Sequence, residues 1–280
     1  MSTKKQIIFF LSTVFILTIL ITNILKDFLG YNTVIVIMFI PAIISLIAKV
    51  IFKDKSATFF IRLNMKKNRS IFMKTLILMP VFMYITAIIN YFIFKTRIGL
   101  LSSVAIYSFQ YTSLFEYLKG ITYEVSNLAI IFPLYGIIQC LCEEFAWRGY
   151  LLPKLCKITS AEKAAILDGL FWGLWQLPVM SILYRDSVSN PIISSIMLII
   201  ASIAIGSIQS YLLYRTESIW CPLILSLSMN SISIYTPAAV FSGIAKGSAS
   251  SCIFSGGAGI IAVLILSIYC YNKNKLVYVD

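Results

Sequence analysis

The chain has 280 residues, of which 59% are hydrophobic and 12% charged, and its mean hydropathy is +0.90. Soluble domains are about 45–50% apolar and about 25% charged, so this composition excludes an ordinary soluble protein and predicts a polytopic membrane protein. The formal net charge of +12 comes from basic residues in short loops between apolar runs. This is the pattern of membrane topology, and it argues against a nucleic-acid-binding surface.

Two apolar runs open the chain, and a basic loop follows them. The run 7–25 predicts a first transmembrane helix rather than a signal peptide, because it is long and no small-residue cleavage site follows it. A second span is expected at 34–52, with Pro41 tolerated as a kink. The loop 53–70 is the most basic stretch and also contains apolar residues. We expect a cytoplasmic loop with a short amphipathic piece on anionic lipid, and lipid or partner docking is the alternative role.

Six further apolar runs follow, with one less apolar stretch among them at 95–127 that predicts an external loop. The expected spans are 71–94, a fourth span from about 128 that exits through Arg148, and then 164–183, 191–214, 219–235 and 252–271. The predicted fold is therefore an all-α polytopic membrane bundle with about eight transmembrane helices.

The spans divide the chain into three regions and set its orientation. We expect an N-terminal transmembrane region at 1–127, a core at 128–235, and a C-terminal loop with the last span at 236–280. Alternating the eight spans from an inside N-terminus places most of the 23 lysine and arginine residues on that side. The positive-inside rule then predicts a multi-pass protein of the cell membrane with both termini cytoplasmic. The Ile-, Lys- and Asn-rich usage is associated with AT-rich bacterial genomes.

Two adjacent carboxylates, Glu143 and Glu144, end the apolar run that begins near residue 128. A charged side chain at the centre of a bilayer costs about 2.5–3.5 kcal/mol on insertion scales, so such residues indicate a functional site. Glu144 and Arg148 are four residues apart and share a helix face, which predicts an ion pair. Glu143 lies about 100° around the helix and needs a separate environment.

Polar residues also recur at helical spacing in two later spans. Asp168, Trp172 and Gln176 line one face of the fifth span, and Ser226 and Asn230 share a face of the seventh. Serine and asparagine in membrane helices often serve only to pack one helix against another. Together with the glutamate pair, however, three polar helices in succession favour a site. Asp168 is expected either to pair with Arg148 or a cytoplasmic lysine, or to assist the chemistry.

The segment from Glu143 to Leu155 resembles the first motif of the CAAX protease and bacteriocin-processing (CPBP) family of intramembrane endopeptidases, Glu-Glu-x-x-x-Arg. The segment 172–178 is similar to the second motif, Phe-x-x-x-His with Leu-Pro after it. The segment 219–230 is similar to the third, His-x-x-x-Asn. The resemblance implies that Glu143 activates water, that Glu144 and Arg148 orient the motif, and that Asn230 stabilises the oxyanion.

The chain departs from this family pattern at both histidines. Gln176 and Ser226 occupy those positions, Trp172 replaces the usual phenylalanine, and the whole chain contains no histidine. Neither replacement accepts a proton as a base near pH 7, and a general acid or base is typically worth about 10²–10⁴-fold in rate. Glu143 and Asn230 do remain.

The sequence is compatible with three functions. The first is a weakened or inactive glutamate-based endopeptidase that acts on a peptide or protein at the membrane. The second is a non-catalytic pseudo-protease that serves as a bacteriocin immunity protein or a membrane regulator. The third is a proton-coupled carrier using the carboxylates, although no internal repeat is visible. We expect no metal and no cofactor, because histidine is absent and the six cysteines lack the spacing of a zinc site.

Overall fold

A computed structural model of the protein describes residues 2–54, 59–94, 132–183, 191–232 and 259–277. Within these ranges the regular structure is entirely helical. The helices are α1 (Thr3–Leu29), the short η1 (Gly30–Asn32), α2 (Thr33–Ile51), α3 (Met65–Phe94), α5 (Phe132–Ala146), the π-helical turn η2 (Trp147–Leu151), α6 (Leu152–Cys156), α7 (Ala161–Leu183), α8 (Pro191–Thr216), α9 (Trp220–Ile232) and α11 (Gly259–Val277).

The prediction of an all-α membrane bundle is confirmed, and a described helix overlaps each of the eight expected spans. Four of these helices are long and apolar enough to cross a membrane by length and composition: α1, α2, α7 and the part of α8 at 195–216. Helix α3 begins at Met65, inside the predicted basic loop, and is kinked at Asn68. The external loop expected at 95–127 lies outside the described residues.

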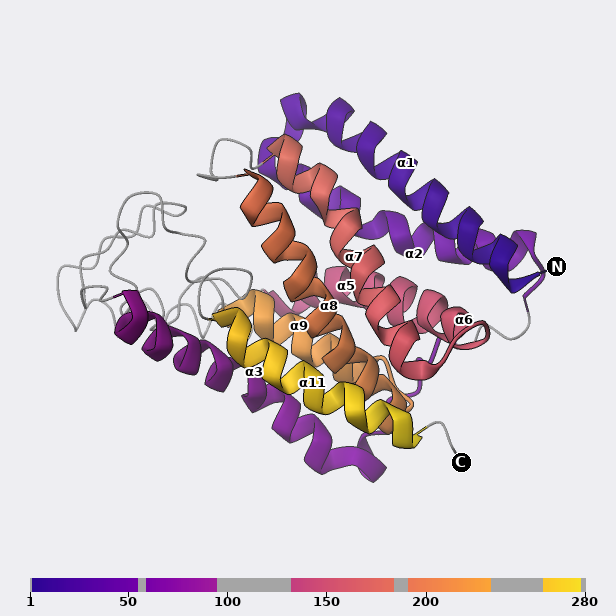
Figure 1. Ribbon diagram of the computed structural model, residues 1–280. Coiled ribbons are helices and arrows are strands. Elements are labelled where there is room, and N and C mark those ends of the chain that lie inside the picture. The colour runs from indigo at the N-terminus through magenta and orange to yellow at the C-terminus, as the bar shows by residue number, and fades with distance from the viewer. Residues whose placement is uncertain (1, 55–58, 95–131, 184–190, 233–258, 278–280) are drawn as a thin grey trace.

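The helices pack as a bundle in which the start of α1 and the end of α11 lie on the same side (Figure 1). Helix α7 packs against α8, and α11 packs against α8 and α3, while α1 and α2 form a pair that contacts α7 and α5. Glycines permit the close approach of α7 and α8, because a Cβ at Gly169 would lie 2.7 Å from the carbonyl oxygen of Ser202. A Cβ at Gly206 would lie 2.7 Å from the Cα of Gly169. Small residues of this kind are typical of helix contacts in membranes.

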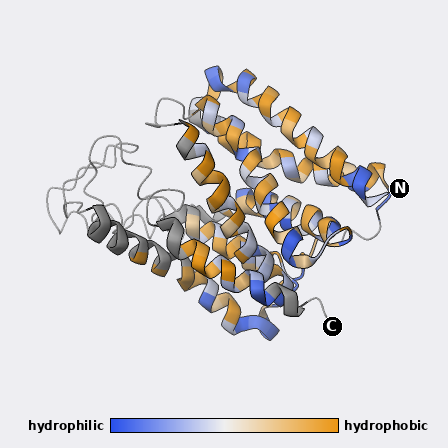
Figure 2. Ribbon diagram, in the orientation of Figure 1, coloured by the Kyte–Doolittle hydropathy of each residue, from blue (hydrophilic) through white to orange (hydrophobic). Residues whose placement is uncertain are grey.

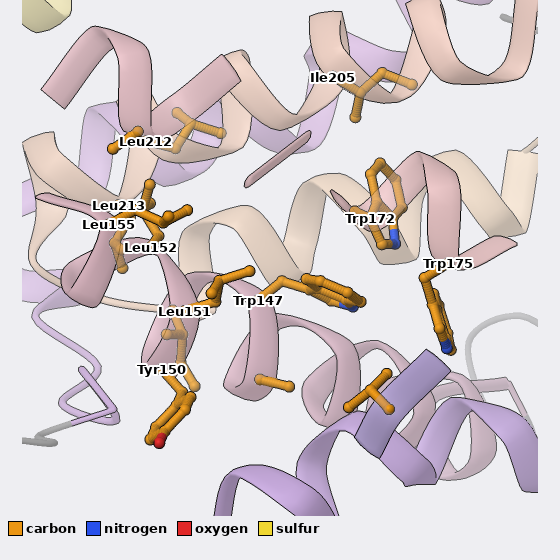
Figure 3. Packing of buried hydrophobic residues seen from close by; sticks show 14 of the residues in the cluster. Trp147, Tyr150, Leu151, Leu152, Leu155, Trp172, Trp175, Ile205, Leu212 and Leu213 are labelled. Carbon is orange, nitrogen blue, oxygen red and sulfur yellow. The ribbon is translucent and has the colours of Figure 1, made fainter. Parts of the chain in front are cut away.

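Apolar side chains face both the outside and the interior of the bundle. Most of the described ribbon is hydrophobic or near neutral, and the start of α3 is a hydrophilic exception (Figure 2). Exposed apolar residues such as Ile8, Ile24 and Val50 lie on α1 and α2, where hydrocarbon would contact them. Inside the bundle, the tryptophans lie on one side of the core and several leucines on the other (Figure 3). The tryptophans are Trp147, Trp172 and Trp175, and the leucines are Leu152, Leu155, Leu212 and Leu213.

A polar clamp ties α6 to the first two helices. The ammonium of Lys154 is almost fully buried, forms an ion pair with Asp54 after α2, and donates a hydrogen bond to the side chain of Gln6 on α1. It also lies 4.5 Å from the ring centre of Tyr150. Burial lowers the pKa of Lys154 from its ordinary value, while Asp54 acts in the opposite direction. Lys154 is therefore a buried side chain with polar partners, although the sequence alone places it among the basic residues that follow the fourth span.

Candidate functional site

The glutamate pair lies at the end of α5, where the helix changes to a wider turn. Residues 147–151 form the π-helical turn η2, and all five are buried. Such turns often occur at functional sites, because they shift the register of the side chains that follow. Glu144 and Arg148 are fully buried and Glu143 is 9% exposed. The chain thus does not leave the bundle at Arg148 as the sequence predicted, because two buried carboxylates hold this side chain inside.

Arg148 is the centre of the charged cluster. Its Nε lies 3.5 Å from Oε2 of Glu144 and 3.3 Å from Oδ2 of Asp168 on α7, and all three side chains are buried. Its guanidinium also lies 4.7 Å from the ring centre of Trp172. Both the predicted pair of Glu144 with Arg148 and the predicted pair of Asp168 with Arg148 are confirmed. A planar guanidinium suits this position because it stays charged and binds several partners at once.

A glutamine from α8 connects the charged cluster to α9. The Gln209 amide nitrogen donates one hydrogen bond to Oε1 of Glu144 at 2.8 Å and a second to Oγ of Ser226 at 2.6 Å. Its carbonyl oxygen accepts a hydrogen bond from Arg148. The Ser226 hydroxyl donates to the same Glu144 oxygen at 2.7 Å. One carboxylate oxygen therefore receives two buried hydrogen bonds from two other helices.

The structure does not bring every predicted site residue into this network. Gln176 is half-buried on α7 and forms no hydrogen bond with another described residue. Asn230 lies in α9, but its side chain is outside the part of the chain that the structure describes. Gln209 was missed by the sequence reasoning, although a glutamine inside an apolar span of 26 residues is itself a signal for a buried polar contact.

Several buried polar atoms around Arg148 have no hydrogen-bond partner among the described residues. They include Oε2 of Glu144, both carboxylate oxygens of Asp168, and Nε and Nη1 of Arg148. The indole nitrogen of Trp147, which lies in η2 with Arg148, also has no hydrogen-bond partner among the described residues. Leaving a buried polar group unpaired costs about 1–3 kcal/mol. Donors and acceptors in this arrangement suit water or the polar groups of a ligand.

Comparison with known proteins supports the family suggested by the motifs. Residues 125–232 match the family model described as "Type II CAAX prenyl endopeptidase Rce1-like". A stretch of 68 residues is 34% identical to CAAX prenyl protease 2 of Methanococcus maripaludis, and it covers 24% of this chain and 24% of that relative. Over residues 125–232 the chain is therefore similar to the CPBP family. The alignment thus spans about a quarter of the curated relative that it matches.

The CPBP segment contains every member of the polar cluster. Glu144, Arg148, Asp168, Gln209 and Ser226 all lie within the matched residues. In the part of the chain that the structure describes, no group of three or more cysteine, aspartate or glutamate side chains is arranged to hold a metal ion. The cluster can bind polar groups and share protons among carboxylates, and Glu143 remains the candidate base beside it.

Proposed function

We propose that this CPBP protein is a non-catalytic member that uses the family's membrane pocket to bind a peptide or protein segment. The observation that carries the proposal is the hydrogen-bonded network of Glu144, Ser226 and Gln209. The oxygen of Glu144 that faces α9 already accepts two hydrogen bonds. Ser226 occupies a position where the family resemblance places a histidine, and here it serves as a hydrogen-bonding link between helices.

The residue types at the site make efficient hydrolysis unfavourable. Peptide hydrolysis needs a proton acceptor for the attacking water and a proton donor for the leaving amine. Gln176 and Ser226 perform neither role near pH 7, and each missing acid or base typically removes about 10²–10⁴-fold in rate. The loss of two such groups reduces the rate to a small fraction of that of a complete site.

The same cluster retains features of a binding site. The buried atoms of Asp168 and Arg148 form an ion pair but no hydrogen bond with described residues, so they can also bind the amide groups of a bound peptide. A peptide backbone carries both donors and acceptors, so it matches a cluster that offers both. The role of an immunity protein, which captures a secreted peptide at the membrane, and the role of a membrane regulator are both compatible with such binding.

The test uses the purified protein in lipid nanodiscs and a fluorescent peptide that ends in a prenylated CAAX sequence, because the curated relative is named as a CAAX prenyl protease. We expect saturable binding of the peptide without cleavage. Glu143→Gln should leave binding unchanged, and Glu217→Gln serves as a matched control at an exposed carboxylate. Failure to bind this peptide would count against the proposed binding role.

A second candidate is a weak peptidase in which Glu143 acts as the base. Glu143 lies next to the network but takes no part in the hydrogen bonds of Gln209 and Ser226, and it is slightly more exposed than Glu144. A carboxylate in this position can accept a proton from water. Cleavage of the prenylated peptide that is lost in Glu143→Gln but kept in Glu217→Gln would establish this candidate and exclude the first.

We also propose that the protein lies in the cell membrane with both termini in the cytoplasm. The excess of basic residues in the loops on the side of the termini supports this orientation. A reporter that is fluorescent only in the cytoplasm, fused to the C-terminus, should give signal. A reporter active only outside the cytoplasm should give none at the same position, and the opposite pattern would reverse the orientation.

A further inference from the structure

The segment 59–64, called the strap below, runs across one end of the bundle before α3 begins. Its backbone is anchored to the turn between α8 and α9. The Phe60 carbonyl accepts a hydrogen bond from the Ile219 amide at 3.0 Å, and the Ile61 carbonyl accepts one from the Trp220 indole at 2.6 Å. Asn64 donates to carbonyls at the end of α8. These contacts hold Phe60 at positive φ, a conformation that a bulky residue rarely adopts, and Asn64 also has positive φ.

The inner side of the strap packs beside the site. The Phe59 ring is buried and stacks on Phe145 with ring centres 4.0 Å apart and planes 5° apart. Gly149 permits this approach, because a Cβ there would lie 3.1 Å from the Phe59 carbonyl oxygen. Phe145 directly follows Glu144, so the strap contacts the helix that carries the glutamate pair. The strap is therefore a fixed part of the bundle surface.

The outer side of the strap combines apolar and basic side chains. Ile61, Leu63 and Met65 are 52%, 47% and 42% exposed. Four exposed basic residues accompany them on the strap and the first turns of α3: Arg62, Lys66, Lys67 and Arg69. None of these four forms an ion pair with another residue in the described part of the chain. Glu217 is an exposed acidic side chain in the adjacent turn, so positive charge predominates here.

We propose that this surface docks on the anionic lipid headgroups of the bilayer in which the protein lies. Basic side chains next to exposed apolar ones are the pattern of a segment at the membrane interface, where the apolar groups enter the headgroup layer and the charges bind lipid phosphates. The position at one end of a bundle of membrane-spanning helices brings the surface to that depth. Docking holds the strap against Phe145 and thus next to the site. This inference does not depend on whether the site is catalytic.

Trp220 provides a local reporter for the test. Its indole is half-buried and hydrogen-bonded to the strap, whereas Trp147, Trp172 and Trp175 are buried in the core. The full-length protein is reconstituted in vesicles that contain increasing mole fractions of brominated phosphatidylglycerol or of brominated phosphatidylcholine, and tryptophan quenching is measured at each mole fraction. Each basic residue near an anionic surface contributes about fivefold to lipid attraction. We therefore expect half-maximal quenching at a mole fraction of the anionic lipid that is at least about fivefold lower.

Matched variants separate local docking from the overall charge of the protein. The triple variant Lys66→Gln, Lys67→Gln, Arg69→Gln keeps only Arg62 of the four basic residues and should therefore lose most of the preference for the anionic lipid. The control variant Lys4→Gln, Lys5→Gln, Lys273→Gln removes the same charge from other exposed positions and should keep the preference. Trp220→Phe should remove the lipid-dependent signal.

Equal quenching of the unaltered protein by both lipids would overturn the proposal. Loss of the preference in the control variant would do the same, because attraction would then follow net charge and not this surface. Peptide binding and cleavage at the site are measured separately, so the two proposals can fail independently.

Discussion

Replacement of Gln209 tests the network at its most connected residue. Gln209 is fully buried and hydrogen-bonds to Glu144, Ser226 and Arg148. The variant Gln209→Met keeps the shape and volume of the side chain but removes its amide. Hydrogen bonds between membrane helices contribute about 0.6 kcal/mol each on average. Losing three of them should therefore lower the free energy of unfolding by at least about 2 kcal/mol. Two of the partners are charged, and bonds to charged groups contribute up to about 3 kcal/mol each. With about 1 kcal/mol for the neutral bond to Ser226, the upper limit for this loss is about 7 kcal/mol.

We expect Gln209→Met to lower the free energy of unfolding by about 3 kcal/mol, between these limits. The assay is reversible unfolding in mixed micelles with increasing fractions of a denaturing detergent, followed by helical circular dichroism. Ser210→Ala is the matched control, because Ser210 is also buried on α8 but, among the described residues, its hydroxyl bonds only to the Gly206 carbonyl of its own helix. A loss below about 0.5 kcal/mol for Gln209→Met, or equal losses for both variants, would refute the network's role in stability.

Further outcomes follow from the cluster, the helix contact and the clamp. Arg148→Lys should lose about 3–5 kcal/mol in the same unfolding assay, because a compact ammonium lacks the planar fork with which the guanidinium reaches both carboxylates and Gln209; unchanged stability would contradict this. Gly169→Ala should lose about 1–3 kcal/mol, since its Cβ would collide with the backbone of α8; a stabilised variant would show that α7 and α8 separate freely. The single variant Lys154→Met should be less stable than the double variant Lys154→Met, Asp54→Asn, because the single variant leaves the charge of Asp54 buried without its partner. A chelator should change neither the unfolding temperature nor peptide binding, and a fall of several degrees would indicate a metal ion.

The sequence predicted the helices and the charged pairs because both depend on local spacing. Apolar runs of membrane length locate the spans, and a separation of four residues places Glu144 beside Arg148. Gln209 could not be assigned to the site in this way, because its partners lie on α5 and α9 and its own helix carries no motif. The position of Gln176 outside the network was also unpredictable, since the motif gives its place along α7 but not the contacts that the neighbouring helices offer. The π-helical turn η2 has no recognisable pattern in the sequence.

The fit between Gln209 and Ser226 constrains the order in which mutations can rebuild a histidine-containing site. The two polar groups are 2.6 Å apart in a buried space. A histidine at position 226 needs room that the Gln209 side chain fills, and a smaller residue at position 209 alone leaves Glu144 and Arg148 short of partners. We therefore expect each single change to lower stability, and the paired change to lower it less than the two single changes together. The two positions are expected to be epistatic, so that stepwise introduction of a histidine at position 226 passes through a less stable intermediate.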